Sequence, residues 1–226
     1  MNGLKRTVLA LVVITAAMGF AFRLELAGSA LFWVALGVPY LLLAALSLHK
    51  LWNEGALSDV LGPRWGDFSL GFLTAALLLL ASWGARAVLA PAGSTRLGWL
   101  FRIYAQVGDP DVVQRSFIYS GALLVIVVCE ELVWRSMVLD ELTQRFGTRR
   151  AWPIAALCYG VTALPTLYTL RDEAAGYNPL LVTAALGCGI VWSFLAMLKG
   201  GRLLPVIIAH GVFTYFSLVQ FRWPWG

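Results

Sequence analysis

The stretch Cys129-Glu130-Glu131-Leu132-Val133-Trp134-Arg135 carries two carboxylates and one guanidinium group inside one of the most apolar parts of the chain. Residues 118–128, which directly precede it, contain no charged side chain. An ionisable group at hydrocarbon depth in a membrane costs several kcal/mol unless it finds a partner or a wet cavity. Three such groups together in an apolar segment therefore indicate a membrane helix with a functional site in its middle.

The overall composition is that of a polytopic membrane protein. The chain has 226 residues, of which 60% are hydrophobic and 13% are charged, and its mean hydropathy is +0.78. Soluble domains carry roughly 25% charged and about 45–50% apolar residues. The net charge of +5 does not indicate a nucleic-acid partner, because the basic residues are spread among short loops and form no patch. We therefore expect the lipid bilayer to be the main surroundings of this protein.

Seven apolar segments approach the ~20 residues that a helix needs to cross a bilayer. They are residues 7–22, 30–48, 68–90, 116–139, 151–170, 179–198 and 203–221. Residues 96–107 mix arginine with apolar side chains over a shorter length, which is typical of a helix in the plane of the interface. We predict an all-α polytopic membrane helix bundle with about seven transmembrane helices and one interfacial helix. We divide it into an N-terminal two-helix membrane segment, 1–67, and a core, 68–226.

The basic residues of the loops favour a cytoplasmic N-terminus. With that orientation every lysine of the chain lies on the cytoplasmic side, and the three arginines at positions 145–150 lie directly beside the end of a span. Cytoplasmic loops of membrane proteins are enriched in Lys and Arg. We therefore predict an integral, multi-pass protein of the cell or inner membrane whose N-terminus is cytoplasmic.

The two adjacent glutamates are expected to have different partners. Glu131 and Arg135 are four residues apart with the acid first, which is the favourable order for an ion pair on a helix. Glu130 points about 100° away from Glu131 and has no local cation. We expect Glu131 to be neutralised by Arg135, and Glu130 to take a proton from water and return it to a leaving amine. The alternative is an ion triad that only fixes helix packing.

A second candidate is His210, which lies in the apolar segment 203–221 with Thr214 four residues later on the same helical face. A histidine inside a membrane segment is more often functional than one in a soluble core. At 1.5 Å per residue, His210 and Glu130 lie roughly 10 Å and roughly 13 Å from the predicted cytoplasmic ends of their helices. We therefore expect these two side chains to meet.

No metal or cofactor is expected. Cys129, Cys158 and Cys188 fall in separate apolar segments without a CxxC spacing, and we interpret them as small buried hydrophobic residues. The two glutamates and one histidine could bind zinc. However, Arg135 competes for a carboxylate, and no second imidazole is placed to complete the site.

Three motifs together resemble a known family. They are Glu-Glu-x-x-x-Arg at 130–135, the loop Leu-Thr-Gln-Arg-Phe-Gly at 142–147, and Pro-x-x-x-Ala-His at 205–210. In this order, over residues 68–221, they resemble the CPBP (Abi) family of glutamate-type intramembrane endopeptidases, which includes the type II CAAX prenyl endopeptidases and bacteriocin-processing or immunity proteins. The resemblance implies that Glu130 activates water and that His210 and Thr214 bind the oxyanion. We add Tyr159 and Trp134 as substrate-binding residues.

The chain departs from the family pattern at two positions. The second family motif is an aromatic residue followed four positions later by histidine, and here the pair is Tyr159 and Ala163. The third motif is histidine followed four positions later by asparagine or aspartate, and here the second residue is Thr214. A threonine hydroxyl still donates one hydrogen bond, whereas alanine offers none. Loss of one member of a cooperating catalytic set can remove most of the activity.

These observations lead to two main hypotheses. The first is an intramembrane endopeptidase that hydrolyses a peptide bond of a membrane-associated protein or peptide with a glutamate-activated water. The alternative is a catalytically impaired or inactive member of the same fold that acts in binding, immunity or regulation. A small transporter is a weaker third hypothesis, because the sequence shows no inverted repeat and no paired broken helices.

Overall fold

The computed structural model describes residues 3–220, which fold into a bundle of helices without a β-strand in that range. Within it, five helices are long and apolar enough to cross a membrane. They are α1 (Gly3–Ala21), α2 (Ala30–Asn53), α4 (Asp67–Leu89), α11 (Leu180–Leu198) and a continuous rod over Phe117–Phe146. The predicted all-α fold class is confirmed, and the chain is an integral, multi-pass membrane protein.

Two of the seven predicted spans are shorter than expected. The predicted span 151–170 corresponds to α9 (Thr148–Thr162), which ends before Pro165. Proline lacks an amide hydrogen and disfavours a helical conformation of the residue before it, so the chain turns and resumes as α10 (Thr166–Thr169). The predicted span 203–221 corresponds to α12 (Leu204–Tyr215) and the π-helical turn η3 (Phe216–Gln220). Phe221 itself lies outside the described residues.

The rod that carries the two glutamates changes its helical type at the motif. It consists of α7 (Phe117–Glu131), the π-helix η2 (Leu132–Val138) and α8 (Leu139–Phe146). The Ser116 hydroxyl caps its start by accepting a hydrogen bond from the backbone N–H of Tyr119. Every residue of η2 is buried. Single π-helical turns within α-helices are frequent at functional sites, and this one begins directly after the glutamate pair.

Small residues allow the long helices to approach closely. A Cβ atom added to Gly71 of α4 would lie 2.7 Å from the side chain of Ile208 in α12. A Cβ atom added to Gly160 of α9 would lie 2.2 Å from the side chain of Leu186 in α11. Helices in membranes pack through such contacts, because lipid provides no hydrophobic driving force between them. The two glycines therefore fix the pairs α4–α12 and α9–α11.

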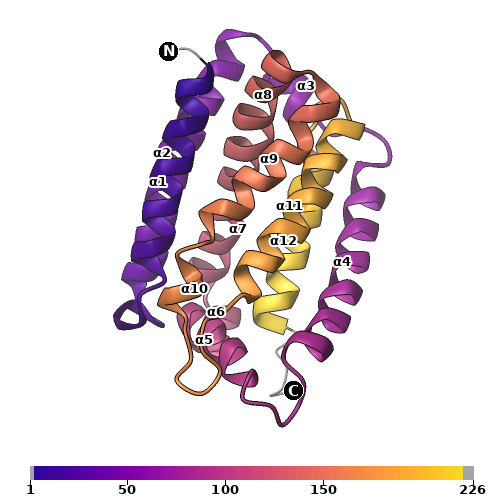
Figure 1. Ribbon diagram of the computed structural model, residues 1–226. Coiled ribbons are helices and arrows are strands. Elements are labelled where there is room, and N and C mark those ends of the chain that lie inside the picture. Colours follow the sequence, from indigo (N-terminus) through magenta and orange to yellow (C-terminus); the bar gives the residue numbers. More distant parts are fainter. Residues whose placement is uncertain (1–2, 221–226) are drawn as a thin grey trace.

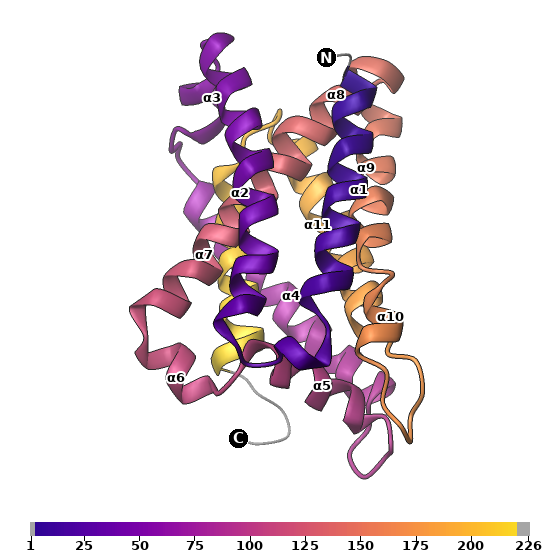
Figure 2. The same cartoon turned by 90° about the vertical axis from the view of Figure 1, so that its left-hand side faces the viewer.

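The two ends of the bundle carry different short elements (Figures 1 and 2). The start of α1, the short helix α3 (Leu57–Leu61) and α8 lie at one end. The helices α5 (Leu97–Val107), α6 (Pro110–Arg115) and α10 lie at the other. α5 occupies the predicted interfacial stretch and buries one side against the bundle. Its Gln106 Nε2 donates hydrogen bonds of 2.9 Å to the backbone carbonyls of Ala21 and Arg23, which ties α5 to the end of α1.

Polar contacts at the N-terminal end join the first helices to the rod. Lys50 of α2 pairs with Asp140 of α8 at 2.5 Å. The Thr7 hydroxyl of α1 donates a 3.0 Å hydrogen bond to Glu141 of α8. These contacts hold α1 and α2 in register with α8, and so with the glutamate pair on the same rod.

Candidate active site

Glu131 lies between two cationic or potentially cationic partners. Its Oε1 atom is 3.4 Å from Nη1 of Arg135 in the π-helix and 2.6 Å from Nδ1 of His210 in α12. The three side chains are almost completely buried. The expected Glu131–Arg135 contact is present. The shorter contact to His210 was not predicted, because nothing in the spacing of the motifs shows which glutamate the histidine approaches.

This short contact fixes the orientation of the imidazole ring. With Glu131 ionised, Nδ1 must carry the hydrogen that it donates at 2.6 Å, because two acceptor atoms repel at this distance. In the neutral ring, Nε2 then has a free lone pair. Nε2 lies 3.7 Å from Oε2 of Glu130, which is beyond hydrogen-bond distance. A water beside the pair can form a hydrogen bond of about 2.8 Å to each atom.

Glu130 lies in a more open environment than Glu131. Its side chain is 14% exposed, whereas that of Glu131 is fully buried. The hydroxyl of Tyr159 in α9 donates a 3.0 Å hydrogen bond to Oε2 of Glu130. This hydrogen bond does not involve Arg135. The structure thus places the two glutamates in different surroundings, with Glu130 accessible and held by a neutral donor.

Aromatic rings enclose the charged side chains. The ring of His210 stacks on Trp192 of α11 with a centroid separation of 3.7 Å and an interplanar angle of 23°. The guanidinium carbon of Arg135 lies 4.7 Å from the ring centroid of Tyr159 and 5.4 Å from that of Trp192. Cation–π contacts of this kind contribute about 2 kcal/mol or more when they are desolvated. The Nε and Nη2 atoms of Arg135 have no hydrogen-bond partner among the described residues. The two aromatic rings therefore supplement the single contact of its Nη1 with Glu131.

Trp192 is a site residue that none of the sequence motifs indicates. Its position carries a usable signal, because tryptophan in membrane proteins concentrates at the two interfaces. Trp192 instead lies within α11, six residues before its end at Leu198, which is about 9 Å along the helix axis. A tryptophan at that depth needs a local reason, and the stacked His210 ring supplies one.

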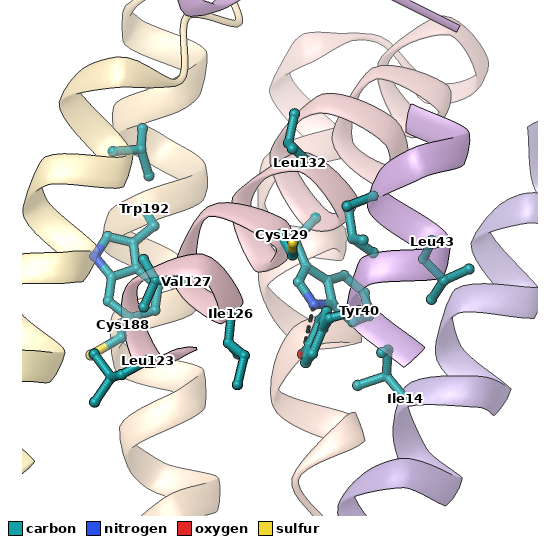
Figure 3. Close-up of a cluster of buried hydrophobic side chains, with 14 of the residues drawn as sticks. Ile14, Tyr40, Leu43, Leu123, Ile126, Val127, Cys129, Leu132, Cys188 and Trp192 are labelled. Atoms are coloured by element: carbon teal, nitrogen blue, oxygen red, sulfur yellow. Dashed lines mark hydrogen bonds between the residues drawn. The ribbon is translucent and has the colours of Figure 1, made fainter. Parts of the chain in front are cut away.

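Trp134 faces α2. It is 1% exposed, and its indole Nε1 donates a 3.3 Å hydrogen bond to the hydroxyl of Tyr40. Figure 3 shows this bond as the dashed line that ends on Tyr40. The edge-on contact between Trp134 and Tyr159 has a centroid separation of 5.6 Å. Trp134 does not line the cavity described below. It packs against Tyr159, which does line that cavity.

A cavity of about 440 Å³ adjoins the accessible glutamate. Glu130, Tyr159, His210 and Thr214 all line it, as does Ala163. Figure 3 shows Leu123, Val127, Cys188 and Trp192, which also line it, gathered between α7 and α11. The volume is in the range of small-molecule and peptide side-chain pockets. The walls are mainly apolar, and polar side chains away from Glu130 and His210, among them Arg86 and Tyr104, also line the cavity.

The position that carries histidine in the family pattern has no polar replacement. Ala163 is 2% exposed and is the C-cap residue directly after α9. The neighbouring hydroxyls are used locally, since Thr162 donates to the carbonyl of Tyr159 and Thr166 donates to the carbonyl of Ala163, each at 2.7 Å. His49 lies near the N-terminal end of the bundle beside Asn53. Among the residues that line the cavity, His210 therefore provides the imidazole.

Residues 3–220 contain no group of three or more His, Cys, Asp or Glu side chains placed to hold a metal ion. The cysteines are Cys129 and Cys188, which are buried, and Cys158, which is half-buried. Each thiol is free.

Comparison with known proteins identifies the part of the chain that holds this site. Residues 113–216 match the family model described as type II CAAX prenyl endopeptidase, Rce1-like. No curated protein and no solved structure matches the chain. The matched segment runs from α6 into η3 and contains the glutamate pair, Tyr159 and His210. The resemblance to the CPBP family that the motifs predicted is confirmed.

Proposed function

Because residues 113–216 match the Rce1-like family model, we propose that the protein is an intramembrane endopeptidase acting on a membrane-associated protein or peptide. One observation carries the proposal. Glu130 faces an apolar cavity, with Nε2 of His210 at 3.7 Å and the hydroxyl of Tyr159 at 3.0 Å. An accessible carboxylate beside an imidazole lone pair is an arrangement that can bind and deprotonate water.

In this mechanism, a water binds between Oε2 of Glu130 and Nε2 of His210. Glu130 takes one proton from it, and the remaining hydroxide adds to the carbonyl carbon of the peptide bond. The carbon–nitrogen bond of the tetrahedral intermediate then breaks, and Glu130 returns its proton to the leaving nitrogen. The products are a carboxyl terminus and an amine, and the reaction needs no reagent besides water.

The other side chains hold these groups in place. Glu131 accepts from Nδ1 of His210 and thereby directs Nε2 toward the water, while Arg135 compensates the charge of Glu131. In this tautomer Nε2 is an acceptor, so we place His210 on the water. We therefore assign stabilisation of the oxyanion to the hydroxyl of Thr214, which lines the same cavity and can donate a hydrogen bond. Tyr159 holds Glu130 through its hydroxyl.

The shape of the cavity suggests the kind of substrate. Besides the helices around Glu130, the last part of α1, the start of α2, the second half of α4 and α5 itself line the cavity, so the space extends from Glu130 toward α5. Its apolar walls suit an apolar, membrane-inserted segment of a protein or peptide. We place the end of the bundle that carries the N-terminus in the cytoplasm, following the lysines. The cavity then extends from the glutamate toward the opposite side of the membrane.

A second function is favoured by one specific observation. Ala163 lines the cavity where the family pattern has histidine, and no neighbouring hydroxyl is free to replace it. A member of the fold that binds a membrane peptide without cleaving it would retain the cavity, the ion pair and the aromatic rings. Such a protein would act in binding, immunity or regulation.

Replacement of Glu130 by glutamine separates the two functions. The change keeps the size of the side chain and its contact with Tyr159 but removes the base. Newly formed protein termini in the membranes of cells that carry Glu130→Gln are compared with those of wild-type cells, with Glu173→Gln on the exposed α10–α11 loop as the control. We expect one or a few termini to disappear in Glu130→Gln alone. Identical termini in all three strains would contradict the peptidase function and favour the binding protein.

A further inference from the structure

Tyr40 lies in α2, outside the family-matched segment 113–216, yet its side chain reaches the site. It is 2% exposed, and its hydroxyl accepts the 3.3 Å hydrogen bond from the indole of Trp134 (Figure 3). We infer that Tyr40 is a positioning residue that sets the place of Glu130 through Trp134 and Tyr159. The helix α2 then completes the active site of the Rce1-like domain. The positioning of Glu130 does not depend on the proposed function, but the expected effect on peptide hydrolysis does.

The contacts between Tyr40 and Glu130 are continuous. Trp134 meets the ring of Tyr159 edge-on, with an interplanar angle of 76°. The ring of Tyr159 also meets Trp192 at 6.1 Å and the guanidinium of Arg135 at 4.7 Å. Neighbours therefore restrict this ring, and its hydroxyl donates to Glu130. A shift of the Trp134 indole changes the position of Tyr159 and so the length of that hydrogen bond.

The hydrogen bond from Trp134 determines the orientation of its indole. A buried indole N–H without an acceptor is unfavourable, so the ring orients toward an available oxygen. The hydroxyl of Tyr40 is the acceptor that the structure provides. Phenylalanine at position 40 would fill the same volume without offering an acceptor. The indole would then turn in search of another acceptor, or remain with its N–H unsatisfied.

A second polar contact between the same two elements provides a matched control. The hydroxyl of Ser47, two helical turns after Tyr40 on α2, donates a 2.8 Å hydrogen bond to the backbone carbonyl of Leu132 at the start of the π-helix. This bond joins α2 to the rod without contacting Trp134. The variant Ser47→Ala therefore loses an interaction between α2 and the rod, but leaves the support of Tyr159 intact.

The test reads Trp134 and Glu130 directly and needs no substrate. Full-length protein labelled with 5-fluorotryptophan is studied by ¹⁹F NMR in detergent micelles, with the Trp134 resonance assigned through Trp134→Phe. The carboxylate band of Glu130 is assigned in infrared spectra through its loss in Glu130→Gln. We expect Tyr40→Phe to shift both signals and Ser47→Ala to shift neither. Product formation in cells should fall about fivefold to tenfold in Tyr40→Phe, the effect of losing about one hydrogen bond.

The outcomes separate this inference from the proposed function. Unchanged Trp134 and Glu130 signals in Tyr40→Phe would overturn the positioning role, as would equal shifts in Ser47→Ala. If Tyr40→Phe does not accumulate, Trp134→Phe removes the donor of the same hydrogen bond and should alter the Glu130 band. An unaltered band would then overturn the inference. Shifted signals without any cleavage by the wild-type protein would retain the positioning role and contradict only the peptidase function.

Discussion

The ion pair between Glu131 and Arg135 allows the energetic account of the site to be tested without a substrate. We consider the variant Arg135→Met, which keeps a long apolar side chain in the π-helix but removes the guanidinium. Both side chains of the pair are fully buried. Removal of one partner leaves the carboxylate of Glu131 with only the His210 hydrogen bond in an apolar surrounding. Breaking a buried pair in this way costs about 3–5 kcal/mol of stability.

An exposed pair with nearly the same separation is the control. Arg64 and Asp59 lie 3.5 Å apart, against 3.4 Å for the buried pair, but their side chains are 55% and 78% exposed. Pairs in water contribute about 0–1 kcal/mol. Arg64→Met should therefore lower the free energy of unfolding by about 1 kcal/mol or less. The difference between the two variants isolates the effect of burial.

The measurement is a double-mutant cycle on the purified protein. Unfolding by sodium dodecyl sulfate in mixed micelles is followed by circular dichroism for the wild type, Arg135→Met, Glu131→Gln and the double variant. Each single change should be strongly destabilising because it leaves a buried group without its partner. The double variant should be more stable than the sum of the single costs predicts, by about 0.5–3 kcal/mol. Additive costs, or a cost of Arg135→Met no larger than that of Arg64→Met, would refute this account of the cluster.

Three further predictions concern the missing imidazole, the helix packing and the orientation. Ala163→His should increase product formation in cells because it adds an imidazole to the cavity wall; a decrease would show that the chain does not use this position. Gly71→Val should destabilise the bundle by about 1–3 kcal/mol by pushing α4 from α12, whereas Gly84→Val, with nothing within 4 Å, should not; equal unfolding curves would contradict this packing. A cysteine at Gly147 should react with an impermeant reagent only from the cytoplasmic side and one at Gly176 only from the opposite side, and the reverse pattern would contradict the predicted orientation.

The sequence predicts the long apolar helices well because length and hydropathy determine membrane insertion. It also predicts that Glu131 and Arg135 pair, since helical spacing alone brings them together. The approach of His210 to the glutamates follows from their similar depth in neighbouring helices. All three predictions rest on one-dimensional quantities: length, spacing and depth.

Features that depend on rotation and packing were not predictable in the same way. The π-helix after Glu131 changes the helical period without a mark in the residue pattern, and it interrupts the regular helix expected over 116–139. The contact between Glu131 and His210 depends on how α7 and α12 are rotated against each other. The contribution of Tyr40 requires α2 to pack beside the rod. Neither the separation of Tyr40 and Trp134 along the sequence nor the composition of the two helices indicates this packing. The early end of α9 is different, because Pro165 was a visible signal.

The most direct test of the central claim follows the oxygen of the activated water. Once a substrate is known from the comparison of termini, wild-type protein and Glu130→Gln are incubated with it in lipid vesicles prepared in ¹⁸O-labelled water. We expect one ¹⁸O atom in the new carboxyl terminus of the product with the wild type. We expect no detectable product with Glu130→Gln. Equal rates of ¹⁸O incorporation in the two proteins would contradict the claim that Glu130 activates the water.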